Sequence, residues 1–174
     1  MEVIKIVTGP LEENCYVLKN DSGSLIVDPG DDYLKIKEAV GDSKLLGILI
    51  THSHFDHIGA LRHFLGKRGL KIFKRSSVLE KEYQVGDFTF SVLFTPGHSK
   101  DSISFYFEES KEMFVGDFVF KETIGRCDLP GGSMDEMRES ISKLKKYPTD
   151  ILLHPGHGED TTLGYEVDTN SFFR

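Results

Sequence analysis

Residues 51–57 read THSHFDH and directly follow the apolar run LLGILI (45–50). Side chains alternate along an extended segment, so His52 and His54 point to the same side, and Asp56 and His57 follow where the chain turns into an expected helix. Imidazole nitrogens and carboxylate oxygens are the usual ligands of Zn²⁺ and related ions. A solvated polar loop is the alternative, but the pattern H-x-H-x-D-H arises by chance in about one chain in a thousand of this composition. The segment therefore predicts a metal site.

Composition and charge narrow the class of protein. The chain has 174 residues, 39% hydrophobic and 28% charged, which predicts a single globular domain over residues 1–174. Its formal net charge of −7 argues against a nucleic-acid partner, because phosphate affinity rests on clustered Lys and Arg. The chain has no apolar run long enough for a membrane span, and its N-terminus, MEVIKIVTG, lacks the pattern of a signal peptide. Two cysteines make no disulfide framework, so we expect a cytoplasmic protein. We also expect no membrane partner, because the chain has no long apolar run.

Short strands and helices alternate irregularly along the chain. The expected strands are EVIKIV (2–7), NCYVLKN (14–20), SLIVD (24–28), LLGILI (45–50), FTFSVLFT (88–95), SISFYFEE (102–109), KEMFVGD (111–117) and, last, DILLHPGHG (150–158). The expected helices are 33–40 with Asp31 or Asp32 as N-cap, 58–69 ending in glycine, and 133–146 with Ser133 and Glu136 as a capping box. Strand pairs recur without helices between them, which favours a mixed α/β sandwich over a regular doubly wound sheet.

Three further side chains repeat one local pattern. His98 in TPGHS, Asp117 in FVGD and His157 in PGHG each stand at or just after the end of an expected strand, beside a glycine. A lone histidine is usually a satisfied polar residue, but ligands gathered at one edge of a sheet are how α/β enzymes build sites. His63 and His154 lack the pattern, and packing or surface roles are the simpler interpretation for both, with a contact behind the ligands as the alternative for His154.

These motifs together resemble a known family. THSHFDH, TPGHS, FVGD and PGHG are similar to the metallo-β-lactamase superfamily, and GRCDLPGGS (125–133) and PGHGEDTTLGYE (155–166) are similar to its glyoxalase II-like hydrolases. The resemblance runs from residue 1 to about residue 170. It implies a four-layer αβ/βα sandwich, in which helices flank two mixed β-sheets and metals lie at one edge.

The resemblance also implies a role for each side chain in the motifs. His52, His54 and His98 would hold one metal, Asp56, His57 and His157 a second, and Asp117 would bridge both. Asp28, in VDPG, is a candidate for a contact behind the ligands, with a simple turn residue as the alternative. Arg126 falls where relatives place a basic residue in the substrate pocket, with a surface salt bridge as the alternative.

The implied activity is hydrolysis of a thioester, such as a hydroxyacylglutathione, or of a related ester. Two divalent ions, zinc first and iron or manganese otherwise, would hold a hydroxide that attacks the carbonyl carbon, with Asp56 positioning it. Only 17 residues follow His157, so the extra helical domain of glyoxalase II is not expected and glutathione specificity stays open. Dinuclear β-lactamases carry Cys where Asp117 stands, which disfavours antibiotic hydrolysis.

Two other functions remain open from the sequence. A persulfide dioxygenase would use one iron held by His52, His98 and Asp117, since two histidines and a carboxylate form the facial triad of iron oxygenases. A non-catalytic metal-binding protein is the third reading. In each case the expected partners are small molecules, and the chain is a monomer or a homodimer.

Overall fold

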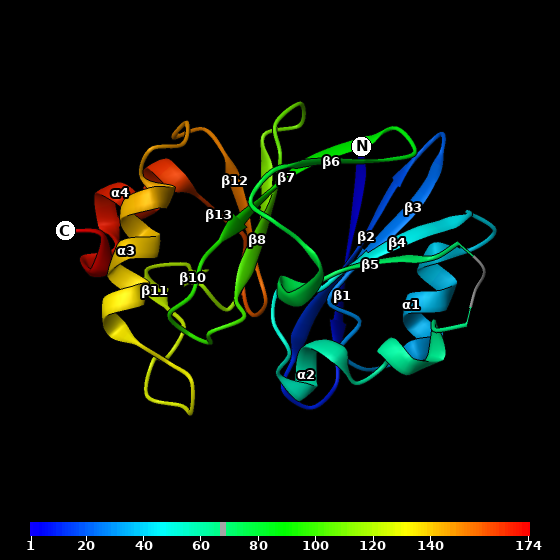
Figure 1. The fold of residues 1–174 in the computed structure, drawn as a ribbon, viewed down its shortest axis with the longest axis horizontal. Coiled ribbons are helices and arrows are strands. Elements are labelled where there is room, and N and C mark those ends of the chain that lie inside the picture. The colour runs from blue at the N-terminus through cyan, green and yellow to red at the C-terminus, as the bar shows by residue number, and fades with distance from the viewer. Residues whose placement is uncertain (67–68) are drawn as a thin grey trace.

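A computed structural model describes residues 1–66 and 69–174. Within them, two mixed sheets lie side by side, with α1 beyond one sheet and α3 and α4 beyond the other (Figure 1). In sheet order, the first sheet comprises β1 (Glu2–Thr8), β2 (Glu13–Asn20), β3 (Gly23–Val27), β4 (Leu45–Leu49) and β5 (Lys71–Phe73). The second comprises β13 (Thr161–Thr162), β12 (Leu152–Pro155), β9 (Glu112–Gly116), β8 (Ile103–Phe107), β7 (Phe88–Phe94) and β6 (Glu82–Val85).

The remaining elements are short. A hairpin joins β10 (Val119–Phe120) to β11 (Thr123–Ile124). The α-helices are α1 (Tyr33–Val40), α2 (Phe55–Ile58), α3 (Met134–Leu144) and α4 (Leu163–Thr169), and the 3₁₀ turns are η1 (Leu61–His63), η2 (Arg75–Ser77) and η3 (Ser171–Phe173). Across the described ranges, no helix has both the length and the apolar character needed to cross a membrane.

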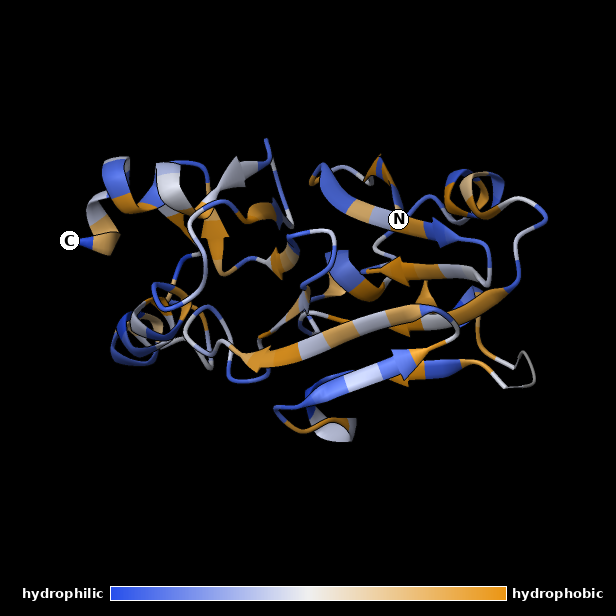
Figure 2. Ribbon diagram, turned by 90° about the horizontal axis from the view of Figure 1, so that it is seen from above, coloured by the Kyte–Doolittle hydropathy of each residue, from blue (hydrophilic) through white to orange (hydrophobic). Residues whose placement is uncertain are grey.

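The alternation of side chains along β2 shows how the layers form. Tyr16 and Leu18 pack with Phe105 of β8 in the core between the two sheets, whereas Cys15 and Val17 pack on the opposite face, toward α1. A period of two places successive side chains on opposite faces of a strand, so β2 is apolar on both. Figure 2 shows apolar residues concentrated along the strands and polar residues in the loops. The predicted four-layer sandwich is confirmed.

Helix α3 forms where the sequence predicts it, with one half of the expected capping box. The hydroxyl of Ser133 accepts a hydrogen bond from the amide of Glu136 at 3.3 Å, which satisfies one free donor of the first turn. Met137, Ile141 and Leu144 recur at helical spacing and are buried against the second sheet. Burial of this stripe fixes the helix over the outer face of that sheet.

The predicted helix over 58–69 is wrong. The chain forms only α2 and then η1, because the amide of Ala60 donates to the carbonyls of Pro29 and Gly30, both at 3.0 Å, and not to a helical partner. This long-range contact interrupts the helix in spite of its apolar spacing. Residues 67–68 of the predicted helix lie outside the described residues.

The start of α1 also differs from its prediction. Asp32 occupies the N-cap position, but its side chain does not cap the helix, and its backbone is left-handed with φ of 48°. Its carboxylate instead accepts hydrogen bonds from the amide of Gly9 at 3.1 Å and from Nζ of Lys35 at 2.8 Å. The aspartate therefore ties α1 to the loop that precedes β2.

The strand expected to be last is followed by β13 and α4. The hydroxyl of Thr162 caps α4 by accepting from the amide of Tyr165 at 3.2 Å. Buried Glu166 accepts from the hydroxyl of Thr161 at 2.6 Å and from the amide of Glu122 at 2.9 Å, so this end of the chain is fixed to the β10–β11 hairpin.

Candidate metal centre

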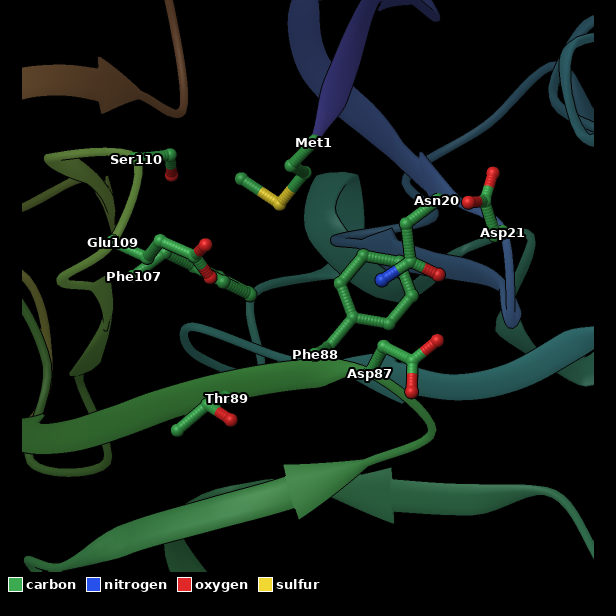
Figure 3. Close-up of a pocket in the computed structure, with 9 residues that line it drawn as sticks. All are labelled: Met1, Asn20, Asp21, Asp87, Phe88, Thr89, Phe107, Glu109 and Ser110. Carbon is green, nitrogen blue, oxygen red and sulfur yellow. The ribbon is translucent and has the colours of Figure 1, made fainter.

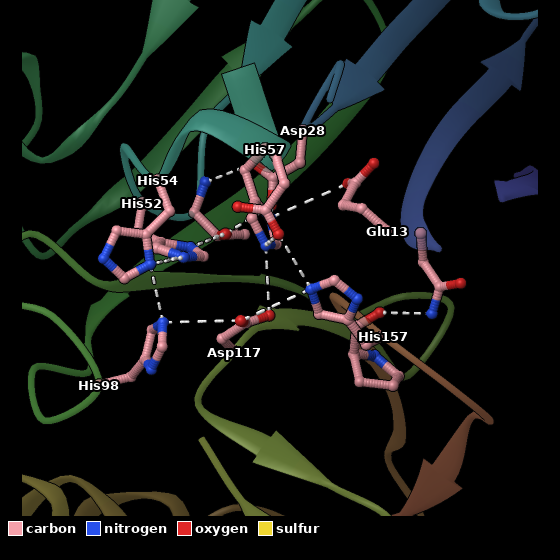
Figure 4. A network of polar contacts seen from close by, with 12 residues as sticks. Glu13, Asp28, His52, His54, His57, His98, Asp117 and His157 are labelled. Carbon is pink, nitrogen blue, oxygen red and sulfur yellow. Dashed lines mark hydrogen bonds and ion pairs between the residues drawn. The ribbon is translucent and has the colours of Figure 1, made fainter. Parts of the chain in front are cut away.

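All the predicted ligands meet at one edge of the sandwich. They follow the carboxyl ends of strands or lie between strands: His52, His54, Asp56 and His57 after β4, His98 between β7 and β8, Asp117 after β9, and His157 after β12. Figure 4 labels the five histidines of this set and Asp117, whose side chains turn toward one another from both sheets. Convergence of this kind is what a metal site requires.

The first ligand group consists of His52, His54 and His98. Nδ1 of His54 lies 3.1 Å from Nε2 of His52 and 2.9 Å from Nε2 of His98, and the three nitrogens can face one ion. Nδ1 of His98 donates to the carbonyl of Arg126 at 2.8 Å, which leaves its Nε2 with a lone pair. Nδ1 of His52 donates to the hydroxyl of Thr51 at 3.1 Å, which likewise leaves Nε2 of His52 with a lone pair. Outer contacts therefore hold these two rings in the tautomer that binds a cation.

The second ligand group consists of Asp56, His57 and His157. Oδ2 of Asp56 lies 3.3 Å from Nε2 of His157 and 3.7 Å from Nε2 of His57. Nδ1 of His57 donates to Oδ2 of Asp28 at 2.9 Å, and Nδ1 of His157 donates to the carbonyl of Leu11 at 3.0 Å. Both rings therefore present Nε2 to the centre of the group.

The carboxylate of Asp117 lies between the two groups. Its Oδ1 is 3.3 Å from Nε2 of His57, and its Oδ2 is 3.5 Å from Nε2 of His98 and 3.7 Å from Nε2 of His157. One side chain thus faces ligands of both groups. This is the placement that a carboxylate shared by two ions needs.

Two buried atoms indicate that a cation fits here. Among the described residues, Nε2 of His57 and Oδ1 of Asp117 are buried without a hydrogen-bond partner. Buried polar atoms without partners are costly, and a divalent ion would satisfy both. Gly156 keeps this space open, because a Cβ there would meet Oδ1 of Asp117 and would lie 2.6 Å from Cε1 of His57. The residues present therefore fit a bound metal.

Burial and neighbouring charge set the protonation of the ligands. Burial, together with the adjacent imidazoles, holds the pKa of His52 well below its usual value, so its ring is neutral at pH 7. Burial would also lower the pKa of His57, but the carboxylates of Asp117 and Asp28 outweigh it and raise that pKa. Burial disfavours ionisation of Asp117, yet contact with His57 holds the pKa of its carboxyl well below the usual range. His52 therefore offers a neutral imidazole and Asp117 an ionised carboxylate, whereas His57 has to give up a proton when a metal binds.

Asp28 forms the contacts that the sequence suggested, and more. Its Oδ1 accepts from the amide of Thr51 at 2.7 Å, and its Oδ2 accepts from the hydroxyl of Thr51 at 2.5 Å in addition to His57. It is 2% exposed and its φ is 47°, so it is not a simple surface turn residue. Asp28 thus fixes the orientation of a predicted ligand ring.

Three other residues that the sequence analysis considered lie outside the two ligand groups: Arg126, His63 and His154. The guanidinium of Arg126 makes two 2.7 Å hydrogen bonds to Asp128 on the exposed surface, and only its backbone carbonyl reaches a ligand, His98. His63 stacks on Tyr33 at the surface, with ring centroids 4.8 Å apart. His154 is buried, and its Nδ1 contacts Asp160. A role for Arg126 in binding substrate stays a prediction.

The sequence analysis did not single out Glu13, which lies beside this centre. Its Oε2 accepts from the hydroxyl of Thr8 at 2.7 Å, and its Oε1 is 3.9 Å from Nδ1 of His57. Burial, and then the charge of Asp28, raises the pKa of Glu13 to about 9, so the side chain is a neutral acid at pH 7. The only sequence signal was an acidic residue directly before the expected strand NCYVLKN (14–20).

Open space lies beside both ligand groups. A cavity of about 330 Å³ is lined by His52 and Ser53, and another of about 240 Å³ is lined by Asp56 and Phe55. A cavity of about 440 Å³ shares no lining residue with the ligands, and three carboxylates line it (Figure 3). The cavities that adjoin the ligands are therefore the better candidates for a substrate.

Comparison with known proteins identifies the family. The family model for the metallo-beta-lactamase superfamily matches residues 8–81 and 75–157. The probable metallo-hydrolase YqgX of Bacillus subtilis is 34% identical, over 97% of this chain and 95% of its own length. The hydroxyacylglutathione hydrolase GloC of Haemophilus influenzae is 29% identical, over 99% of this chain and 97% of its own length. The chain belongs to the metallo-β-lactamase superfamily.

Solved structures agree with this assignment. The BLEG-1 B3 metallo-beta-lactamase superimposes with a TM-score of 0.93 at 32% identity, over 99% of both chains. TTHA1623 in a di-iron-bound form superimposes with a TM-score of 0.86 at 32% identity, over 98% of this chain and all of its own. The first of these neighbours is named as a metallo-beta-lactamase. The second is similar to this chain and holds two irons.

Proposed function

We propose that this protein is a dinuclear metal-dependent hydrolase that cleaves small-molecule thioesters, with hydroxyacylglutathione-like compounds as the first candidates. The position of Asp117 carries the proposal, because one carboxylate faces both His57 of the second ligand group and His98 of the first. Seven ligand side chains around two positions suit hydrolysis better than a single-ion triad of His52, His98 and Asp117.

The side chains have distinct roles in the proposed reaction. Two divalent ions in the ligand groups would supply Lewis acidity for the carbonyl oxygen and would lower the pKa of the attacking water. Oδ2 of Asp56 faces His57 and His157, which leaves its Oδ1 to orient that water and to accept its proton. Asp28 and the carbonyl of Leu11 keep the two rings in the tautomer that this arrangement needs.

Two observations favour a thioester as substrate. A thiolate leaves without a strong general acid, and Glu13, whose raised pKa would suit a general acid, is 1% exposed. GloC, named as a hydroxyacylglutathione hydrolase, aligns with nearly the whole chain. We further propose zinc as the metal, since histidine and aspartate suit it, although the same donors accept iron or manganese.

A substrate panel tests the proposal. Metal-replete protein is offered an S-hydroxyacylglutathione, a simple carboxylic ester and a β-lactam, with release of thiol, alcohol or opened ring as the readout. We expect thioester hydrolysis at least tenfold faster in kcat/KM than the other two. The variant Asp56→Asn, with its metal content measured, should lose most of this activity. Oxygen uptake with glutathione persulfide, together with no thioester turnover, would contradict the proposal and favour the iron dioxygenase.

A further inference from the structure

The loop that carries His157 leaves the second sheet but is held by the first. The side-chain amide of Asn14 donates to the carbonyls of Pro155 and Gly158, both at 3.0 Å, and its backbone amide donates to Gly156 at 2.7 Å. The hydroxyl of Tyr16 donates to Pro155 at 2.7 Å. A ligand loop therefore depends on contacts across the two halves of the sandwich.

Asp160 closes this loop three residues after His157. Its Oδ1 accepts from Nζ of Lys5 on β1 at 3.1 Å and from the hydroxyl of Tyr16 on β2 at 3.4 Å. Its Oδ2 accepts from Nδ1 of His154 on β12 at 3.2 Å. One carboxylate thus joins two strands of the first sheet to a strand of the second, beneath the loop that presents His157. Nζ of Lys5 also donates to the carbonyl of Gly158 at 2.6 Å, so the loop is held at both ends.

The charge of Asp160 is matched by His154. That ring is 3% exposed, stacks on Phe114 with centroids 4.6 Å apart, and places Nε2 at 3.4 Å from Oε1 of Glu112. Burial would lower the pKa of His154, but Asp160 and Glu112 outweigh it and raise that pKa. A buried imidazolium between two carboxylates needs both partners, so loss of one disturbs the whole cluster.

We propose that Asp160 is a positioning residue for the second ligand group and not for the first. Its bonds to Lys5, Tyr16 and His154 hold the loop so that Nε2 of His157 faces Asp56 at 3.3 Å. The first ligand group is oriented elsewhere, by the hydroxyl of Thr51 and the carbonyl of Arg126. Disturbing Asp160 should therefore weaken one of two bound ions selectively. This inference rests on the proposed dinuclear centre.

Asp160→Asn tests the proposal, because it keeps the side-chain volume and removes the charge. Zn²⁺ is titrated into metal-free protein against a competing chelator, and circular dichroism checks the fold. We expect one of the two dissociation constants to rise about 10- to 100-fold and the other to stay within about twofold. Asp150→Asn, which removes the exposed ion pair with Lys111, is the matched control and should change neither.

Two further variants keep the test decisive. Lys5→Met should shift the same constant in the same direction even if Asp160→Asn does not fold. In a His157→Ala background, Asp160→Asn should add no further loss, because both changes act on one ligand. Equal weakening of both ions, or no weakening, overturns the positioning role. Wild-type protein that binds only one Zn²⁺ would instead overturn the dinuclear proposal itself.

Discussion

Replacing Asp28 by asparagine is expected to release a metal ion without unfolding the protein. Asparagine tolerates the left-handed backbone at this position, where φ is 47°, and its carbonyl can still accept from the amide of Thr51. Its NH₂ group would replace Oδ2 and point hydrogens at Nδ1 of His57, which now donates across 2.9 Å. His57 can then pair with the asparagine only by moving its own proton to Nε2, the atom that faces Asp117.

The size of the effect follows from that one lost hydrogen bond. A buried hydrogen bond to a charged group contributes about 1.5–3 kcal/mol. Metal binding has to restore the ligating tautomer of His57 at this cost, so affinity for the second ion should fall roughly 10- to 150-fold. The hydroxyl of Thr51 donates to the same Oδ2 and accepts from His52, so its proton also loses its acceptor, and this figure counts only the contact with His57.

Chelator competition with Zn²⁺ measures the effect directly. Asp42→Asn changes an exposed aspartate outside the site and serves as the control with unchanged affinity. Thermal unfolding of the metal-free protein reports separately on the fold. If Asp28→Asn bound both ions as tightly as wild type, the ring of His57 would not be oriented by Asp28, and the account of the second ligand group would be wrong.

Three other predictions concern packing and pH. Gly156→Ala places a methyl group against Asp117 and His57, so at least one ion should be lost in metal analysis while circular dichroism stays unchanged. Phe105→Ala should reduce the free energy of unfolding by about 3–5 kcal/mol in urea titrations, because the ring is fully buried between the sheets. The raised pKa of His154 means that its ion pairs stabilise the fold fully below its unfolded pKa near 6.5 and lose this contribution as pH rises through the folded pKa. In the metal-free protein, the stability advantage of wild type over His154→Gln should therefore shrink as the pH rises above the unfolded pKa of histidine, near 6.5.

The candidate ligands can be picked out from the sequence because they lie in short segments with strong local patterns. His52, His54, Asp56 and His57 are contiguous, and His98 and His157 stand in glycine turns after apolar strands. The apolar character of β2 on both faces likewise predicts a strand with packing on each side. Such features depend on neighbours in the chain, which a single sequence displays.

The features that the sequence does not reveal depend on distant contacts. Ala60 donates to Gly30 and so ends a helix that its own neighbours favour. Tyr16 and Asp160 are 144 residues apart, and no local pattern links them. Glu13 lies on β2 and Asp28 directly follows β3, and the antiparallel pairing of these strands leaves both carboxyl groups at the end of the sheet near His57. Long-range pairing, and not local propensity, therefore decides how the ligands are held.

Elemental analysis of the purified protein tests the central claim most directly. The geometry of the two ligand groups and of Asp117 predicts about two divalent ions per chain. The variant His54→Ala should lower this number, because it removes the nitrogen on which His52 and His98 converge. A wild-type chain that holds a single iron would contradict the dinuclear centre, and the proposed thioester hydrolysis would lose its structural basis.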